Sequence, residues 1–125
     1  MQAEISDTEY EVISVIWDAH PATAKDILER LNTTKEFHPK TVNTLLNRLV
    51  KKQAISYQKD GRAFKYSPLI EKENYVKRKC QHFLSKMFDG KVSPLVANFA
   101  SHDILKKDDI EDLKKLIQEW EDKND

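Results

Sequence analysis

The fold is decided by residues 38–52, HPKTVNTLLNRLVKK. Read as a helix at 100° per residue, this stretch separates an apolar face from a polar face that contains no acidic residue. The apolar positions are Val42, Leu45, Leu46 and Leu49. The polar face and its borders hold Lys40, Thr41, Asn43, Thr44, Asn47, Arg48 and Lys51. The apolar face would fix the helix to a protein body, so these seven polar residues are predicted to face outward and bind DNA.

Two further amphipathic helices are predicted before this one. Residues 6–9, SDTE, have the pattern of a capping box that opens the first helix, which ends near the proline at position 21. A second helix starts after Thr23 as its cap, and residues 32–34 close it. The chain therefore begins with two helices that lead into a third, polar-faced one.

A β-hairpin is predicted after the third helix. Residues 55–58 and 63–67 alternate between apolar and polar side chains around a predicted loop at residues 59–62, KDGR. Lys59 and Arg62 in this loop are predicted to contact DNA phosphates. Three helices and a basic hairpin predict a winged helix-turn-helix, in which the third helix enters the major groove.

Three aromatic residues lie in the predicted hairpin: Tyr57, Phe64 and Tyr66. Their rings could stack on bases, as aromatic side chains do in many nucleic-acid-binding proteins. Alternation in a hairpin that packs on helices nevertheless favours core packing for most of them.

Charge is distributed unevenly along this neutral chain. The 21 basic and 21 acidic residues cancel over 125 residues, but residues 35–66 hold eight basic residues and two acidic ones, a net charge of +6. Residues 1–34 and 101–125 are both acidic. A localised positive surface indicates a defined phosphate footprint rather than a diffuse polycation.

Composition and pattern divide the chain near Pro68. We predict a winged-helix DNA-binding domain at residues 1–69 and a helical dimerisation domain at residues 70–125. The predicted fold is mainly α, with three C-terminal helices: a long one from residue 71 to the glycine at 90, a short one at 95–101, and a last one that Asp108 caps.

Three helices in roughly 55 residues make a poor core alone. Cys80 is the only cysteine, so no disulfide can form within the chain. We therefore predict a homodimer in which a second copy completes the apolar face and presents a second reading helix to a palindromic, double-stranded DNA operator. The predicted interface consists of Phe83, Met87, Leu95, Phe99, Leu113, Leu116, Ile117 and Trp120.

The lone cysteine also bears on location. Cys80 lies at helical spacing from Tyr75, Phe83 and Leu84, which predicts a buried thiol rather than a redox sensor. A single unpaired cysteine is consistent with a reducing cytoplasm. With no apolar run of about 18 residues and no signal peptide, we expect a cytoplasmic protein without membrane insertion.

An enzyme is not expected from this sequence. Gly61 and Gly90 are the only glycines, so a glycine-rich phosphate loop is missing, and no nucleophile has a plausible base in its sequence context. The four histidines lack metal-ligand spacing. We therefore expect no catalytic residues, no metal site and no cofactor.

Taken together, the chain resembles the BlaI/MecI family of penicillinase repressors over nearly its whole length. The segments that carry the resemblance are ISDTEYEV at 5–12, VIW at 15–17, PKTV through Arg48-Leu49 at 39–49, and SPLVANF at 93–99. The resemblance implies a dimeric repressor that holds its operator until a membrane-bound zinc metalloprotease receptor senses a β-lactam and has the repressor cut. It also implies that the scissile bond is Asn98–Phe99.

The chain departs from its relatives in one residue of the third predicted helix and in its C-terminal residues. Asn43 stands where relatives often carry Arg, so the operator bases read there are expected to differ. The C-terminal residues, EDKND, lack the cysteine-rich tail of copper-responsive relatives, which argues against a copper sensor.

Two other functions stay open. One is a winged-helix regulator that answers to a small-molecule effector or a partner protein rather than to proteolysis. The other is an adaptor that uses the winged helix to bind protein, for which absent DNA affinity and a salt-insensitive partner would be diagnostic.

Overall fold

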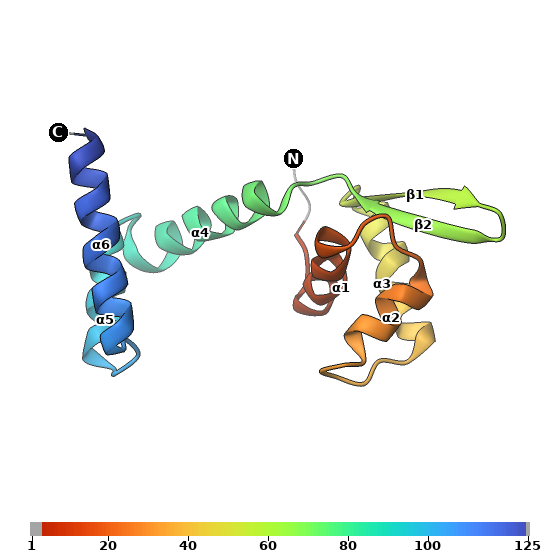
Figure 1. Cartoon of the computed structure of the whole chain (residues 1–125), viewed down its shortest axis with the longest axis horizontal. Helices are drawn as coiled ribbons and strands as arrows, with labels where there is room; N and C mark the ends of the chain where they lie inside the picture. Colours follow the sequence, from red (N-terminus) through yellow and green to blue (C-terminus); the bar gives the residue numbers. More distant parts are fainter. Residues whose placement is uncertain (1–3, 125) are drawn as a thin grey trace. The chain divides into compact units, whose positions relative to one another are not determined.

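The computed structural model describes residues 4–124 and is mainly helical (Figure 1). Its elements are α1 (Asp7–Asp18), α2 (Ala24–Leu31), α3 (Pro39–Lys51), β1 (Ile55–Asp60), β2 (Ala63–Pro68), α4 (Lys72–Phe88), α5 (Val92–Ser101) and α6 (Lys107–Asn124). They form two compact units, Met1–Val76 and Lys77–Asp125. The order of elements confirms a winged helix-turn-helix followed by three helices.

Capping boxes begin the first two helices; the sequence predicted the box at Ser6 and, for the second helix, a cap at Thr23. The Ser6 hydroxyl accepts from the Glu9 backbone N–H at 3.2 Å, and the Glu9 carboxylate accepts from the Ser6 N–H at 2.9 Å. Thr23 and Asp26 form the same reciprocal pair at the start of α2, at 3.1 and 3.2 Å. Both boxes satisfy N–H groups that a helix start leaves without backbone partners.

Helix α3 follows the prediction closely. His38 is its cap, with Nδ1 accepting from the Lys40 N–H at 3.1 Å, and Pro39 occupies the first turn. The predicted apolar positions Val42, Leu45, Leu46 and Leu49 are all buried. Gln53, with φ 61°, follows the C-terminal cap Lys52 and turns the chain toward β1.

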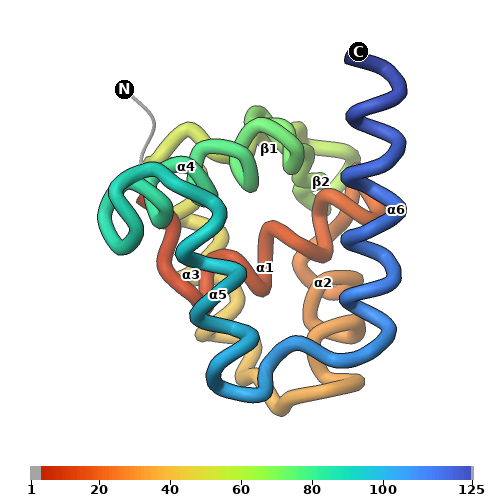
Figure 2. The backbone as a smooth tube through the Cα atoms, turned by 90° about the vertical axis from the view of Figure 1, so that its left-hand side faces the viewer, coloured from red at the N-terminus to blue at the C-terminus, as the bar shows by residue number. Residues whose placement is uncertain are grey.

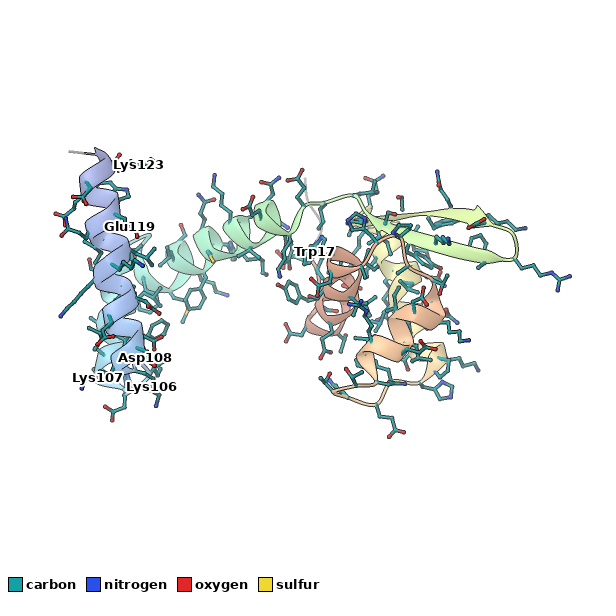
Figure 3. All side chains as sticks on the ribbon, viewed as in Figure 1. Trp17, Lys106, Lys107, Asp108, Glu119 and Lys123 are labelled. Atoms are coloured by element: carbon teal, nitrogen blue, oxygen red, sulfur yellow. The ribbon has the colours of Figure 1, made fainter. Side chains whose placement is uncertain are left out.

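The core of the unit Met1–Val76 consists of apolar side chains from its helices, its hairpin and the segments between them. Sixteen apolar side chains are buried: Ile5, Val12, Ile13, Ile16, Ala22, Ile27, Leu31, Phe37, Val42, Leu45, Leu46, Leu49, Ala54, Ile55, Tyr66 and Tyr75. Helix α1 packs on both α2 and α3, and its Trp17, labelled in Figure 3, donates Nε1–H to the Ile70 carbonyl at 2.9 Å. This core holds α3 with its polar face outward.

The hairpin is longer than predicted. Strands β1 and β2 pair antiparallel from Ile55↔Pro68 to Asp60↔Ala63, so only residues 61–62 form the turn. Gly61, at φ 65°, occupies the first turn position, where a type II′ turn needs glycine. The four-residue loop predicted at 59–62 is therefore wrong: Lys59 belongs to β1. At the base of the hairpin, Ala22 and Tyr66 exchange two backbone hydrogen bonds, of 3.0 and 2.8 Å.

The boundary between the two units falls within α4, beyond the predicted division at 69/70. Tyr75 is buried because its ring lies 5.8 Å from that of Tyr10 and 6.0 Å from that of Trp17, between ring centroids. The first turn of α4 is thereby part of the winged-helix core. A pattern that is continuous along one helix gave no signal for this break.

The unit Lys77–Asp125 contains the rest of α4 and the helices α5 and α6, which a short turn joins (Figure 2). Helix α5 begins three residues before the predicted start, at Val92. Helix α6 begins at Lys107, and Asp109, not Asp108, accepts from the Lys106 N–H at 3.0 Å. Figure 3 shows Lys106, Lys107 and Asp108 at this end of the helix.

No residue from 77 to 124 is buried. Cys80 is exposed, so the predicted buried thiol is wrong for the single chain. The physical reason is that the apolar positions of α4 have no neighbouring layer to close over them.

Candidate nucleic-acid interface

All nine residues predicted to bind DNA are exposed on the winged-helix unit. Seven lie on α3, and the hairpin supplies the other two, Lys59 in β1 and Arg62 in the turn. The exposure of the seven residues on α3 follows from the buried opposite face of that helix. We call these nine residues, which are predicted to bind DNA, the reading face: Lys40, Thr41, Asn43, Thr44, Asn47, Arg48, Lys51, Lys59 and Arg62.

The basic residues of segment 35–66 divide into two groups. Three form ion pairs: Lys35 with Glu11 at 3.6 Å, Lys65 with Asp60 at 3.0 Å, and Lys52 with Glu9. The other five make no ion pair within residues 4–124, and all belong to the reading face: Lys40, Arg48, Lys51, Lys59 and Arg62. The cations that remain available for phosphates are therefore those that the sequence pattern selected.

Thr44 sits in the exposed face of α3 with part of its hydroxyl already used. Its Oγ1–H donates to the Lys40 carbonyl one turn earlier, at 3.0 Å. The oxygen lone pairs and the methyl group are what it can still offer to a ligand. These suit a base-edge donor or the methyl group of thymine in a major groove.

A buried ion pair fixes the C-terminal end of α3. Glu9 is 1% exposed, and its carboxylate accepts from the Lys52 ammonium, which also donates to the Glu4 carbonyl at 2.6 Å. Burial raises the pKa of the Glu9 carboxyl, but the hydrogen bonds from Lys52 and Ser6 outweigh it and hold that pKa below the usual value. Sequence reasoning missed this pair, because nothing local relates two residues 43 positions apart.

Two of the three aromatic residues in the hairpin do not pack in the core as predicted. Tyr66 is buried as expected, but Tyr57 is 52% and Phe64 45% exposed, so core packing is wrong for two of the three rings. Tyr57 and Phe64 meet edge to face, with ring centroids 5.2 Å apart. Tyr66 belongs to the core of this unit, whereas Tyr57, its partner in the ladder, and Phe64 lie outside that core.

The predicted dimer residues all lie in the unit Lys77–Asp125. Phe83, Met87, Leu116, Ile117 and Trp120 are exposed; Leu95, Phe99 and Leu113 are half-buried. Trp120, at 65%, is the most exposed large apolar side chain of this part of the molecule. The half-buried residues Phe99 and Leu113 help to line a groove of about 400 Å³ between α5 and α6.

The Asn98–Phe99 bond lies in the last turn of α5. The Asn98 carbonyl accepts from Ser101 Oγ at 3.1 Å and from His102 Nδ1 at 2.8 Å. Two side chains thus hold this carbonyl at the C-terminal end of α5.

Residues 4–124 show neither a metal cluster nor a membrane-spanning helix. These residues contain no cluster of three or more His, Cys, Asp and Glu side chains that could hold a metal ion. None of their helices has the length and apolar character to cross a bilayer.

Known proteins match this chain along most of its length. The model of the family described as "Penicillinase repressor" matches residues 5–119. The penicillinase repressor of Bacillus licheniformis is 35% identical over 116 residues, which cover 93% of this chain and 91% of the relative. The methicillin resistance regulatory protein MecI of Staphylococcus aureus (strain N315) is 36% identical over 114 residues, covering 91% and 93%.

The fold matches a solved DNA complex. The solution structure of the Bacillus licheniformis BlaI monomeric form in complex with the blaP half-operator is 39% identical, with a TM-score of 0.52. The match covers 60% of this chain and 92% of that one.

Proposed function

The chain belongs to the penicillinase repressor family, and from that premise we propose that it represses transcription as a homodimer on an inverted-repeat DNA operator. Members of this family are transcriptional repressors, so the chain is not an enzyme. A repressor acts where the chromosome is, which implies a cytoplasmic location.

The observation that carries DNA binding is the reading face. Its five basic residues are exposed and make no ion pair within residues 4–124, and α3 has no acidic side chain to repel phosphate. The related BlaI was solved on a half-operator. In the proposal, the exposed face of α3 enters the major groove, and Lys59 and Arg62 reach the neighbouring phosphates.

Dimerisation is supported by the apolar surface of α4 and α6. Phe83, Leu116 and Trp120 are exposed in the single chain, and a second copy would remove them from water. One winged helix alone gives non-specific affinity of roughly 10⁻⁴ to 10⁻⁶ M. Joining two raises operator affinity by about 10² to 10⁴ without new contacts. Loss of the dimer would therefore be enough to release the operator.

Proteolysis is the proposed switch, with a membrane metalloprotease that senses a β-lactam as the partner. A cut at Asn98–Phe99 would detach α6, with Leu113, Ile117 and Trp120, from the DNA-binding half. Because the Asn98 carbonyl is held by side chains of the last turn, opening that turn frees the bond without unfolding the rest of α5.

The test of operator binding uses the full-length chain and an inverted repeat that it selects from a randomised pool of DNA duplexes. We expect the logarithm of affinity to fall steeply and linearly with the logarithm of salt concentration. A single half-site should bind about 10²-fold or more weaker than the repeat. A slope near zero would refute the phosphate footprint, and equal affinity for both duplexes would refute the dimer.

The switch needs its own test. After the producing cells meet a β-lactam, mass spectrometry should find a fragment that ends at Asn98. If repression lifts while the chain stays intact, an effector-controlled regulator replaces this proposal. The apolar groove beside Phe99 and Leu113 is the feature that favours that alternative.

A further inference from the structure

The inner face of the hairpin carries two exposed rings that the proposed contacts do not use. Strand side chains alternate between faces, and the register Tyr57↔Tyr66 and Lys59↔Phe64 places all four of these residues on the face that Ile55 shares. Ile55 and Tyr66 are buried, whereas Tyr57, which pairs with Tyr66, and Phe64, two residues nearer the turn, are exposed. The apolar face of the hairpin therefore continues beyond the core.

This overhang forms one wall of a groove of about 340 Å³. Asn47, Val50 and Lys51 of α3 form the opposite wall, and Tyr57, Phe64 and Tyr66 line the hairpin side. Asn47 and Lys51 belong to the reading face. The groove thus lies where a ligand of α3 would pass under the hairpin, and not on a separate surface.

The chemistry of the groove alternates between apolar and cationic groups. Tyr57 and Phe64 offer ring surfaces, and Lys51 makes no ion pair within residues 4–124. Lys59, equally without an ion pair there, lies on the same hairpin face as Phe64, its partner in the ladder. A DNA strand has the matching alternation, because each anionic phosphate is followed by a deoxyribose with mostly C–H surface.

We propose that one strand of the bound duplex is seated in this groove, with deoxyribose rings packed against Tyr57 and Phe64 and phosphates beside Lys51 and Lys59. This rests on the proposed function, and it assigns the two rings to DNA backbone binding. Sugar contacts carry no sequence information, so the rings contribute affinity for any sequence and leave base preference to α3.

The affinity test compares the full-length chain with Tyr57→Ala, Phe64→Ala and the double variant. Binding is measured across salt on the selected inverted repeat and on a duplex of scrambled sequence. Losing a half-exposed ring should weaken binding to both duplexes about five- to tenfold, because roughly half of its apolar surface is involved. The salt slope should stay unchanged, since no phosphate contact is lost, whereas Lys51→Ala should reduce it by about one.

Leu69→Ala is the matched control, because Leu69 is exposed but does not line the groove. It should bind both duplexes like the parent. The unfolding temperature of each free variant is measured in parallel. Tyr57→Phe, which keeps the ring, should restore the affinity lost in Tyr57→Ala and so separate ring contact from a change in folding.

Hydroxyl-radical footprinting gives a second readout, because the radical attacks deoxyribose directly. At saturating protein, the parent should protect a short run of sugars in each half-site, and the double variant should lose that protection. Unchanged protection, or affinities within twofold of the parent, would overturn the proposal. A parent that binds no duplex would instead refute the proposed function itself, so the two failures are distinguishable.

Discussion

The described part of Met1–Val76 buries sixteen apolar side chains in one core, whereas residues 77–124 bury none. Both regions have amphipathic helices with apolar positions at helical spacing. The difference is that α1, α2, α3 and the hairpin cover one another, while the second unit exposes Leu116 and Trp120. The first unit covers its own apolar positions and the second leaves its apolar positions exposed, which is why the proposed dimer and the proposed switch are assigned to the second unit.

The largest effect should come from removing the incomplete half. A chain that ends at Asn98 should lose operator affinity by about 10² to 10⁴, because avidity disappears, while weak non-specific binding persists. Its winged-helix core should unfold as in the parent, since that core lies before residue 77. Sedimentation and duplex titration measure both quantities. A dimer that held the operator as tightly as the full chain would show that cleavage here is not an off-switch.

The same leucine-to-alanine change should act differently in the two units. Leu46 is fully buried, so Leu46→Ala should lower the free energy of unfolding by about 2–5 kcal/mol, as measured by denaturant titration of the winged-helix transition. Leu116 is 61% exposed, so Leu116→Ala should leave that transition unchanged.

Sedimentation equilibrium supplies the other half of this test. Leu116→Ala should weaken self-association, and Leu46→Ala should not do so at temperatures where it is folded. If Leu116→Ala left self-association as strong as in the parent, α6 would lie outside the dimer interface.

The buried pair Glu9 and Lys52 should stabilise the first unit by a moderate amount. Glu9→Gln should cost roughly 2–3 kcal/mol, below the range for a fully buried pair because the Lys52 side chain is 31% exposed. Glu11→Gln, which removes an exposed pair with Lys35 at 3.6 Å, is the control and should change stability by less than about 1 kcal/mol.

The pH dependence of this pair has a defined sign. The folded pKa of Glu9 lies below the ordinary value of 4.5, so its contribution is full above that pH and is lost as the pH falls toward the folded pKa. The stability gap between parent and Glu9→Gln should therefore narrow on acidification below 4.5. A gap that stayed constant would mean that the carboxylate charge contributes nothing.

The smallest effects should distinguish residues within the reading face. Thr44→Ala should cost about 1–3 kcal/mol of operator binding and relax base preference at one position of each half-site. Arg62→Ala should weaken all sequences alike and lower the salt slope by about one. Selection of preferred sites from a randomised pool checks both, and equal loss of specificity would contradict the division.

Local signals carried most of the fold prediction. The predicted caps at Ser6 and Thr23, and the apolar spacing of α3, each depend on residues within a turn or two, and the structure has all of them. The order of elements and the family resemblance followed from these.

The misses share a physical cause, which is contact between distant residues. Nothing near Tyr75 in sequence indicates that it packs on α1, and nothing near Glu9 indicates Lys52. Tyr57 and the buried Tyr66 pair in the ladder, so the exposure of Tyr57 and Phe64 depends on which part of the hairpin the rest of the chain covers, and alternation along a strand does not reveal that. Seven of the nine candidate DNA-binding residues were predicted because they lie on one helix, and the other two because they belong to one basic hairpin. The groove was not predicted, because it needs both elements.

The acidic character of α6 has an electrical consequence for the severed chain. Residues 1–98 contain 16 basic and 12 acidic residues, a net charge of +4, and residues 99–125 carry the opposite −4. A cut at Asn98 would turn a neutral protein into a cationic piece and an anionic one. The cationic piece would stay attracted to the chromosome as a whole while it loses its hold on one site. The cationic fragment would then spread over non-specific DNA sites, and transcription would resume before any fragment is degraded.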